Sequence, residues 1–125
     1  EFETLHPRNE AVPYVVYQIG RSYFDQIDTP DRDQKTARKA IEVFSRLVRQ
    51  FPADAYSTKA RAHIKRCQKS IAQHELYVGM FYLSGGHYPA AISRFRLILN
   101  QYPDVGVHQA AIRFIAKSEA LMKKK

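Results

Sequence analysis

The chain has 125 residues, with 20 Lys and Arg against 12 Asp and Glu, which gives a net charge of +8 at neutral pH. This length predicts one small domain, and no stretch approaches the roughly 20 apolar residues that a membrane-spanning helix needs. The single cysteine, Cys67, excludes an internal disulfide, and its apolar neighbours predict a buried thiol.

Residues 1–9 are expected to close an earlier helical repeat. Pro7 would end a helix, because proline cannot continue the backbone hydrogen bonding, and Asn9 is a candidate N-cap for the next helix. The first residues show no signal-peptide pattern. We therefore expect the chain to be part of a longer protein.

Residues 10–53 predict two helices joined by a loop. The first runs to about Asp25 and has Pro13 in its first turn, where proline costs no hydrogen bond. The second spans about residues 34–51, because apolar side chains recur there every three or four positions. Small and aromatic residues in this pair have the spacing of a tetratricopeptide (TPR) repeat; they are Gly20, Tyr23, Ala40, Phe44 and Pro52.

The loop at residues 25–33 carries four aspartates. It lacks the ligand spacing, central glycine and terminal glutamate of an EF-hand, so calcium binding is not expected. We interpret it as a polar insertion in the repeat, with Asp33 as the N-cap of the second helix.

Residues 55–84 predict one long helix, because no proline or glycine interrupts the pattern before Gly79. It is longer than the first helix of an ordinary repeat. One apolar stripe runs along it, formed by Tyr56, Ala60, Ile64, Cys67, Ile71, Val78 and Phe81.

A basic ridge is expected on the opposite side of this long helix. It consists of Lys59, Arg61, Lys65, Arg66 and Lys69. The ridge is compatible with a solvated outer face, with a contact for an acidic partner, or with nucleic acid. No known nucleic-acid-binding motif accompanies the charge, which makes the last interpretation the weakest.

The small–aromatic spacing returns in residues 79–103, at Gly79, Tyr82, Ala91, Phe95 and Pro103. Residues 88–101 would form the second helix of this long-helix repeat, which spans residues 55–104. A last helix, about residues 106–122, would open a further repeat, with no partner helix in this chain and an exposed apolar face. The fold is thus predicted to be all-α: a single TPR-like domain of about five helices, an α-solenoid.

No catalytic pattern is present. The chain has no glycine-rich phosphate loop, nucleophile elbow or HExxH motif. His63 and His74 are three turns apart on the long helix and cannot share a metal. We therefore expect no enzyme activity, no metal and no cofactor.

A peptide-binding groove is the remaining candidate site. First helices line the concave side of stacked pairs, and aromatic, arginine and methionine side chains are enriched at interfaces. An equally open alternative is that some of these side chains pack against a preceding repeat, as part of a core. The groove candidates are Tyr14, Tyr17, Arg21 and Phe24 from the first helix and Leu76, Met80 and Leu83 from the long helix.

The sequence resembles the BamD (YfiO, ComL-like) family of outer-membrane assembly lipoproteins over nearly its whole length. Three features carry the resemblance: the loop that ends Asp31-Arg32-Asp33, the Phe-x2-Leu-Val-Arg-x-Phe-Pro run that ends at Pro52, and the long helix through His74-Glu75-Leu76-Tyr77-Val78. The chain would correspond to the second and third repeats of a five-repeat protein, with edges of the first and fourth.

The resemblance implies a non-catalytic scaffold of the outer-membrane β-barrel assembly machinery, on the periplasmic face of the cell outer membrane. Its implied partners are unfolded outer-membrane proteins and other assembly subunits. The lipidated cysteine of the family would lie upstream, so Cys67 is not that residue. Two other interpretations remain open at this point: a generic TPR adaptor with an unrelated protein partner, and a basic nucleic-acid-binding module.

Overall fold

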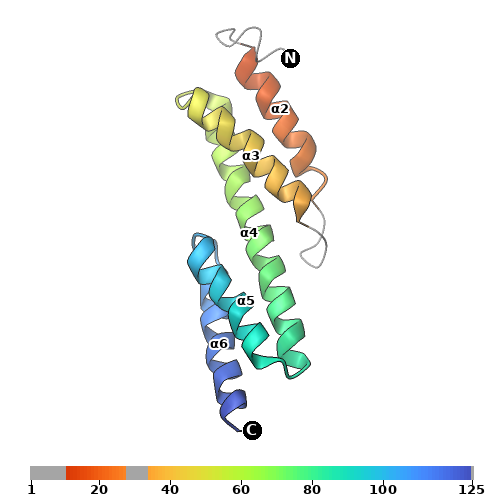
Figure 1. Cartoon of the computed structure of the whole chain (residues 1–125). Coiled ribbons are helices and arrows are strands. Elements are labelled where there is room, and N and C mark those ends of the chain that lie inside the picture. Colours follow the sequence, from red (N-terminus) through yellow and green to blue (C-terminus); the bar gives the residue numbers. More distant parts are fainter. Residues whose placement is uncertain (1–10, 28–33, 125) are drawn as a thin grey trace. The chain divides into compact units, whose positions relative to one another are not determined.

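The computed structural model describes residues 11–27 and 34–124 (Figure 1). These residues form helices and no strand, which confirms the all-α prediction. The helices are α2 (Val12–Phe24), α3 (Lys35–Gln50), α4 (Ala55–Ser84), α5 (Tyr88–Gln101) and α6 (His108–Lys123). The predictions for residues 1–9, which include Pro7 and Asn9, and for Asp33 fall outside the described residues.

The helix ends follow from the local sequence. Pro13 lies in the first turn of α2, and Pro89 has the same place in α5. The Oδ1 atom of Asp54 accepts a hydrogen bond from the N–H of Tyr56 at 2.8 Å, which satisfies a free donor at the start of α4. Gly86 follows the end of α4 with a φ of 78°, a conformation that favours glycine. The observed bounds of α4, Ala55–Ser84, are those predicted for the long helix.

The chain divides into two compact units, and α4 contributes one part to each. The described part of the first unit comprises α2, α3 and α4 up to Cys67. Neighbouring helices run in opposite directions in this unit (Figure 1). Its largest fully buried side chains are those of Val12, Val16, Phe44, Leu47, Ser57 and Cys67.

Gly20 of α2 packs directly against the Phe44 ring of α3. A Cβ atom built on Gly20 would overlap that ring, so the two helices approach more closely there than any larger residue permits. The Ser57 hydroxyl of α4 donates to the Phe51 carbonyl oxygen at 2.6 Å. The contact between Gly20 and Phe44 explains why the predicted repeat spacing has glycine at position 20 and an aromatic ring at position 44.

The second unit comprises α4 from Gln68, α5 and α6. Its core contains Ala72, Ala91, Phe95, Ile98, Val107 and Ala111. A Cβ atom on Gly79 would overlap the Phe95 ring, so the contact of the first unit recurs here. The Glu75 carboxylate, only 5% exposed, accepts hydrogen bonds from Nη1 of Arg94 at 3.2 and 3.3 Å.

The last helix packs on the preceding one: α6 lies against α5, and the Phe114 ring stacks on Phe95 with 5.6 Å between ring centroids. Ile112 and Met122 of α6 are exposed. One expectation for this unit was wrong. Phe81 was assigned to the buried stripe but is 69% exposed. Phe81 follows Gly79 by two residues, which places it about 200° around the helix from the face that contacts α5.

No helix in the described ranges is long and apolar enough to cross a membrane.

Candidate peptide-binding surface

The four groove candidates on α2 have different exposures. Tyr14 is 47% exposed, whereas Tyr17 is buried with 6% of its surface accessible. Arg21 and Phe24 are half-buried. Tyr14 is therefore the aromatic side chain of this set that is most available to a ligand, and Tyr17 belongs to the layer beneath it.

Two rings of α4 join these α2 side chains into one aromatic cluster. Tyr56 lies 5.4 Å from Tyr14 and 5.2 Å from Tyr17, measured between ring centroids. His63 lies 4.4 Å from Phe24 by the same measure. Tyr56 and His63 were not among the groove candidates, because nothing in a single sequence pairs residues of two helices that are about forty positions apart.

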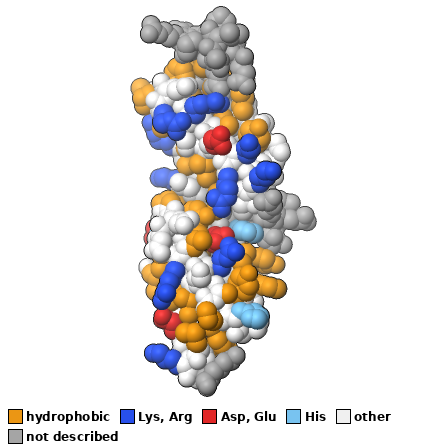
Figure 2. All heavy atoms as spheres, viewed as in Figure 1, with side chains coloured by type: hydrophobic (Ala, Val, Ile, Leu, Met, Phe, Trp, Pro, Cys, Tyr) orange, Lys and Arg blue, Asp and Glu red, His pale blue; other side chains and the backbone are white. Residues whose placement is uncertain are grey.

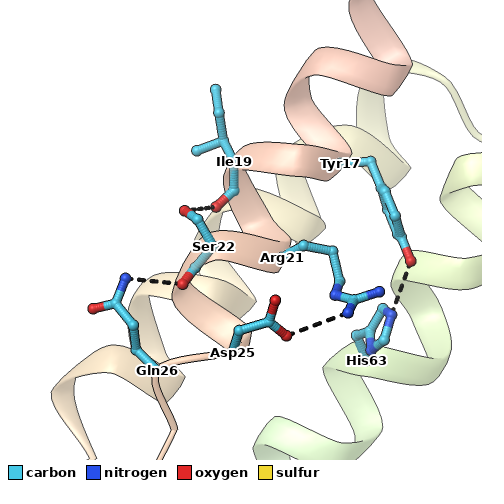
Figure 3. Close-up of polar contacts among 7 residues, drawn as sticks. All are labelled: Tyr17, Ile19, Arg21, Ser22, Asp25, Gln26 and His63. Carbon is cyan, nitrogen blue, oxygen red and sulfur yellow. Dashed lines mark hydrogen bonds and ion pairs between the residues drawn. The ribbon is translucent and has the colours of Figure 1, made fainter.

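A hydrogen bond fixes the centre of the cluster. The Tyr17 hydroxyl lies 2.9 Å from Nε2 of His63 and shares a hydrogen bond with it. Figure 3 shows the Arg21 side chain beside the His63 ring, with its guanidinium held by Asp25 of the same helix; Nη2 of Arg21 lies 3.3 Å from Oδ1 of Asp25. The buried Tyr17 thus supports the exposed surface and orients the His63 ring.

The environment of His63 favours its neutral form. Burial lowers the pKa of His63, and the positive charges of Arg21 and Arg66 lower this pKa further. The negative charge of Asp25 acts in the opposite direction as a smaller cause. A neutral ring suits a position that is packed between Phe24 and Phe44, because an imidazolium would lose hydration there.

Part of the basic ridge borders this aromatic cluster. Nζ of Lys59 lies 5.3 Å from the ring centroid of Tyr56, a cation–π geometry. Arg66 is close enough to His63 to influence its protonation. The ridge residues Lys59, Arg61, Lys65, Arg66 and Lys69 are all exposed. Lys and Arg side chains also spread over the face in Figure 2, with few Asp or Glu among them.

The second unit has its own apolar surface on α4. Of the three candidates there, Leu76 and Leu83 are partly buried against the core, and only Met80 is exposed, at 41%. Tyr77 and Phe81, exposed at 51% and 69%, flank Met80. With Ser84 these three side chains line an open hollow of about 260 Å³. The exposed face of α4 in this unit is therefore displaced around the helix from the face that carries Leu76 and Leu83.

The described residues contain no group of three His, Cys, Asp or Glu side chains that could hold a metal ion. Cys67 is fully buried, and burial raises the pKa of its thiol to about 11. A thiol in this state is a poor nucleophile near neutral pH.

Comparison with known proteins identifies the family. A family model for YfiO, described as an outer membrane lipoprotein, matches residues 1–125. Proteins named outer membrane protein assembly factor BamD are similar in sequence. The one from Caulobacter vibrioides is 32% identical over 101 residues, which cover 81% of this chain and 33% of that protein. The one from Neisseria gonorrhoeae is 28% identical over 131 aligned positions, which cover 97% of this chain and 46% of that protein.

A third relative, from Haemophilus influenzae, has the same name and is 36% identical over 81 residues, which cover 65% of this chain and 31% of that protein. The chain thus spans only 31% to 46% of the length of these relatives. The three relatives are all named outer membrane protein assembly factor BamD. The chain belongs to the YfiO family of outer membrane lipoproteins.

Proposed function

We propose that this chain is a non-catalytic protein-binding scaffold in outer-membrane protein assembly. On this proposal the aromatic surface between α2 and α4 receives an extended segment of an unfolded outer-membrane protein at the periplasmic face of the membrane. The observation that carries the proposal is one exposed tyrosine, Tyr14, which packs on the Tyr56 ring of the aromatic cluster. The cations Lys59 and Arg66 border this cluster at Tyr56 and His63.

The chemistry of the surface supports a peptide ligand. Aromatic and arginine side chains are enriched in the centres of protein interfaces, because they bury large areas and combine apolar contact with polar tips. The hydrogen bond between Tyr17 and His63 holds the lower layer in place before a ligand arrives. A surface that is already ordered loses less side-chain entropy on binding.

Docking of other assembly subunits is a second part of the proposal. The exposed side chains Tyr77, Met80 and Phe81 of the second unit are an apolar surface of the kind that protein partners cover. The names of the relatives support a role in assembly, and the absence of a metal-ligand cluster in the described residues is compatible with a binding role.

The experiment that tests the peptide site is a fluorescence anisotropy titration of the chain with a labelled ten-residue peptide. The peptide carries aromatic residues at alternate positions, and a second peptide of equal composition carries them consecutively. We expect saturable binding of the first peptide that persists at high salt, and weaker binding of the second. Tyr14→Ala should weaken binding roughly tenfold, which corresponds to about 1.4 kcal/mol.

Ile112→Ala is the matched control, because Ile112 of α6 is 49% exposed, close to the 47% of Tyr14, and lies in the other unit. This variant should bind the peptide as the unmodified chain does. Equal affinities of the Tyr14→Ala and unmodified chains would contradict the proposed site. Binding that Tyr77→Ala abolishes instead would move the peptide site to the second unit.

A further inference from the structure

We propose that a second face of α4, on its first half, docks an acidic helical segment of a partner protein. The face is centred on Arg61 and Lys65 and extends to Lys59 and Arg66. Lys59 and Arg66 border both this face and the peptide surface. Arg61 and Lys65 take no part in the peptide surface, so substitutions at these two residues test this proposal separately.

The helical rotation of about 100° per residue arranges this face in three rows. Arg61 and Lys65 form one outer row, and Lys59 and Arg66 form the other. The exposed small residues Ala55, Thr58 and Ala62 lie between them. Cations therefore flank a central row of small side chains from Ala55 to Ala62, where the backbone of a partner helix has room to approach, and Lys69 continues this row.

No acidic side chain in the described residues pairs with these four cations. The acidic residues in the described part of the first unit are Asp25, Glu42 and Asp54. Asp25 is paired with Arg21, and Asp54 accepts a hydrogen bond from the N–H of Tyr56 at the start of α4. The positive potential of the face is thus left for an external anion, and such a potential accelerates association with a partner of opposite charge.

Two of the cations are held in place by contacts within the chain. Nη2 of Arg61 donates a hydrogen bond to the Pro52 carbonyl oxygen at 2.8 Å, and Lys59 rests over the Tyr56 ring. Fixed cations suit a partner whose anions also have fixed positions. Membrane surfaces present mobile headgroups, and proteins that lie on them usually insert large apolar side chains, which the central row lacks.

The spacing of the cations matches that of an acidic helix. Arg61 and Lys65 are about 6 Å apart along the helix axis, and Lys59 and Arg66 about 10.5 Å. Asp or Glu residues four and seven positions apart on a partner helix repeat these two spacings. We therefore assign the face to an acidic protein helix, with anionic lipid and nucleic acid as the alternatives to be tested.

The test uses the whole 125-residue chain and three probes. The first probe is a helical Ala-rich peptide in which Glu residues are spaced four and seven positions apart. The other two are phosphatidylglycerol vesicles and a single-stranded DNA oligonucleotide. Arg61→Glu with Lys65→Glu should weaken peptide binding at least tenfold. The matched control is Arg113→Glu with Lys117→Glu, which reverses two exposed cations at the same i, i+4 spacing on α6 and changes the net charge equally.

The proposal predicts that the control variant keeps the affinity of the unmodified chain for the Glu peptide, and that this affinity falls as salt rises. Both charge-reversed variants should retain helical circular dichroism and binding of the aromatic peptide. An equal loss of Glu-peptide binding in the two variants would overturn the proposal, since only net charge would then matter. The proposal would also be overturned if vesicles or DNA bound more tightly than the Glu peptide and only the Arg61→Glu, Lys65→Glu variant lost that binding.

Discussion

The Tyr17 hydroxyl of α2 lies 2.9 Å from Nε2 of His63 on α4. The Tyr56 ring of α4 contacts both Tyr17, which is buried, and the exposed Tyr14. The pair therefore fixes both the distance between the two helices and the orientation of the rings on which a ligand would rest. The proposed peptide surface depends on this support.

Tyr17→Phe tests the support directly. The substitution keeps the ring and its packing but leaves the His63 nitrogen without its hydroxyl partner. We expect the free energy of unfolding to fall by about 0.5–1.5 kcal/mol, the usual net value of such a hydrogen bond. Urea denaturation measures the change, and Tyr14→Phe, which alters an exposed hydroxyl, is the control. If the two variants are equally stable, the hydrogen bond does not hold the helices together.

His63 predicts a pH dependence of stability. Its pKa in the folded chain is below the ordinary value of 6.5, so the unfolded chain takes up a proton at higher pH than the folded chain does. The contribution to stability is complete above about pH 6.5 and is lost as the pH falls through the folded-state pKa. We expect the urea midpoint to decrease from pH 7.5 to pH 5.

His63→Gln isolates this effect from other titrating groups. Glutamine can still hydrogen-bond to the Tyr17 hydroxyl but does not titrate, so the urea midpoint of the variant should change less between the two pH values. Parallel changes in the variant and the unmodified chain would mean that other groups cause the dependence.

Gly20→Ala tests the close approach of α2 and α3. The added methyl group would overlap the Phe44 ring, and overpacking of this kind costs about 1–3 kcal/mol. Alanine also has a higher helix propensity, worth about 1 kcal/mol, so we expect a net loss of up to roughly 2 kcal/mol. Gln18→Ala, at an exposed position of the same helix, should change stability by less than about 0.5 kcal/mol. A Gly20→Ala chain that is more stable than the unmodified one would disprove the close contact.

Cys67 should resist thiol reagents in the folded chain. With the pKa of its thiol at about 11, roughly one molecule in a thousand carries the thiolate at pH 8, and the side chain is fully buried. Reaction with a disulfide reagent should be fast only after unfolding in urea. Ser93→Cys in a Cys67→Ala chain provides an exposed thiol for comparison. Equal rates for the two folded chains would show that Cys67 is accessible.

The helices themselves were predictable from the sequence, and the reasons are local. Prolines and glycines mark the helix ends, and an uninterrupted pattern from Ala55 to Ser84 predicts one helix. The positions of Gly20 and Gly79 were also predictable, because their spacing to Phe44 and Phe95 is that of a repeat in which a ring fills the space above a glycine.

The binding surface was less predictable, because it depends on contacts between helices. The pairing of Tyr17 with His63 and of Tyr14 with Tyr56 joins residues that periodicity treats separately. The apolar stripe predicted for the long helix was also wrong at Phe81, which is exposed. Its burial depends on which face of α4 meets α5, and that face is set by Gly79 against Phe95 rather than by the apolar residues of the first half of α4.

The most direct test of the peptide-binding account places a photoreactive residue at the proposed contact. p-Benzoylphenylalanine at position 14 replaces an exposed tyrosine by a similar ring, and the same residue at position 112 of α6 is the control of equal exposure. On irradiation with the labelled alternating aromatic peptide, the account predicts a crosslink at position 14 that unlabelled peptide suppresses, and none at position 112. Crosslinks of equal yield at both positions, or at position 112 alone, would contradict it.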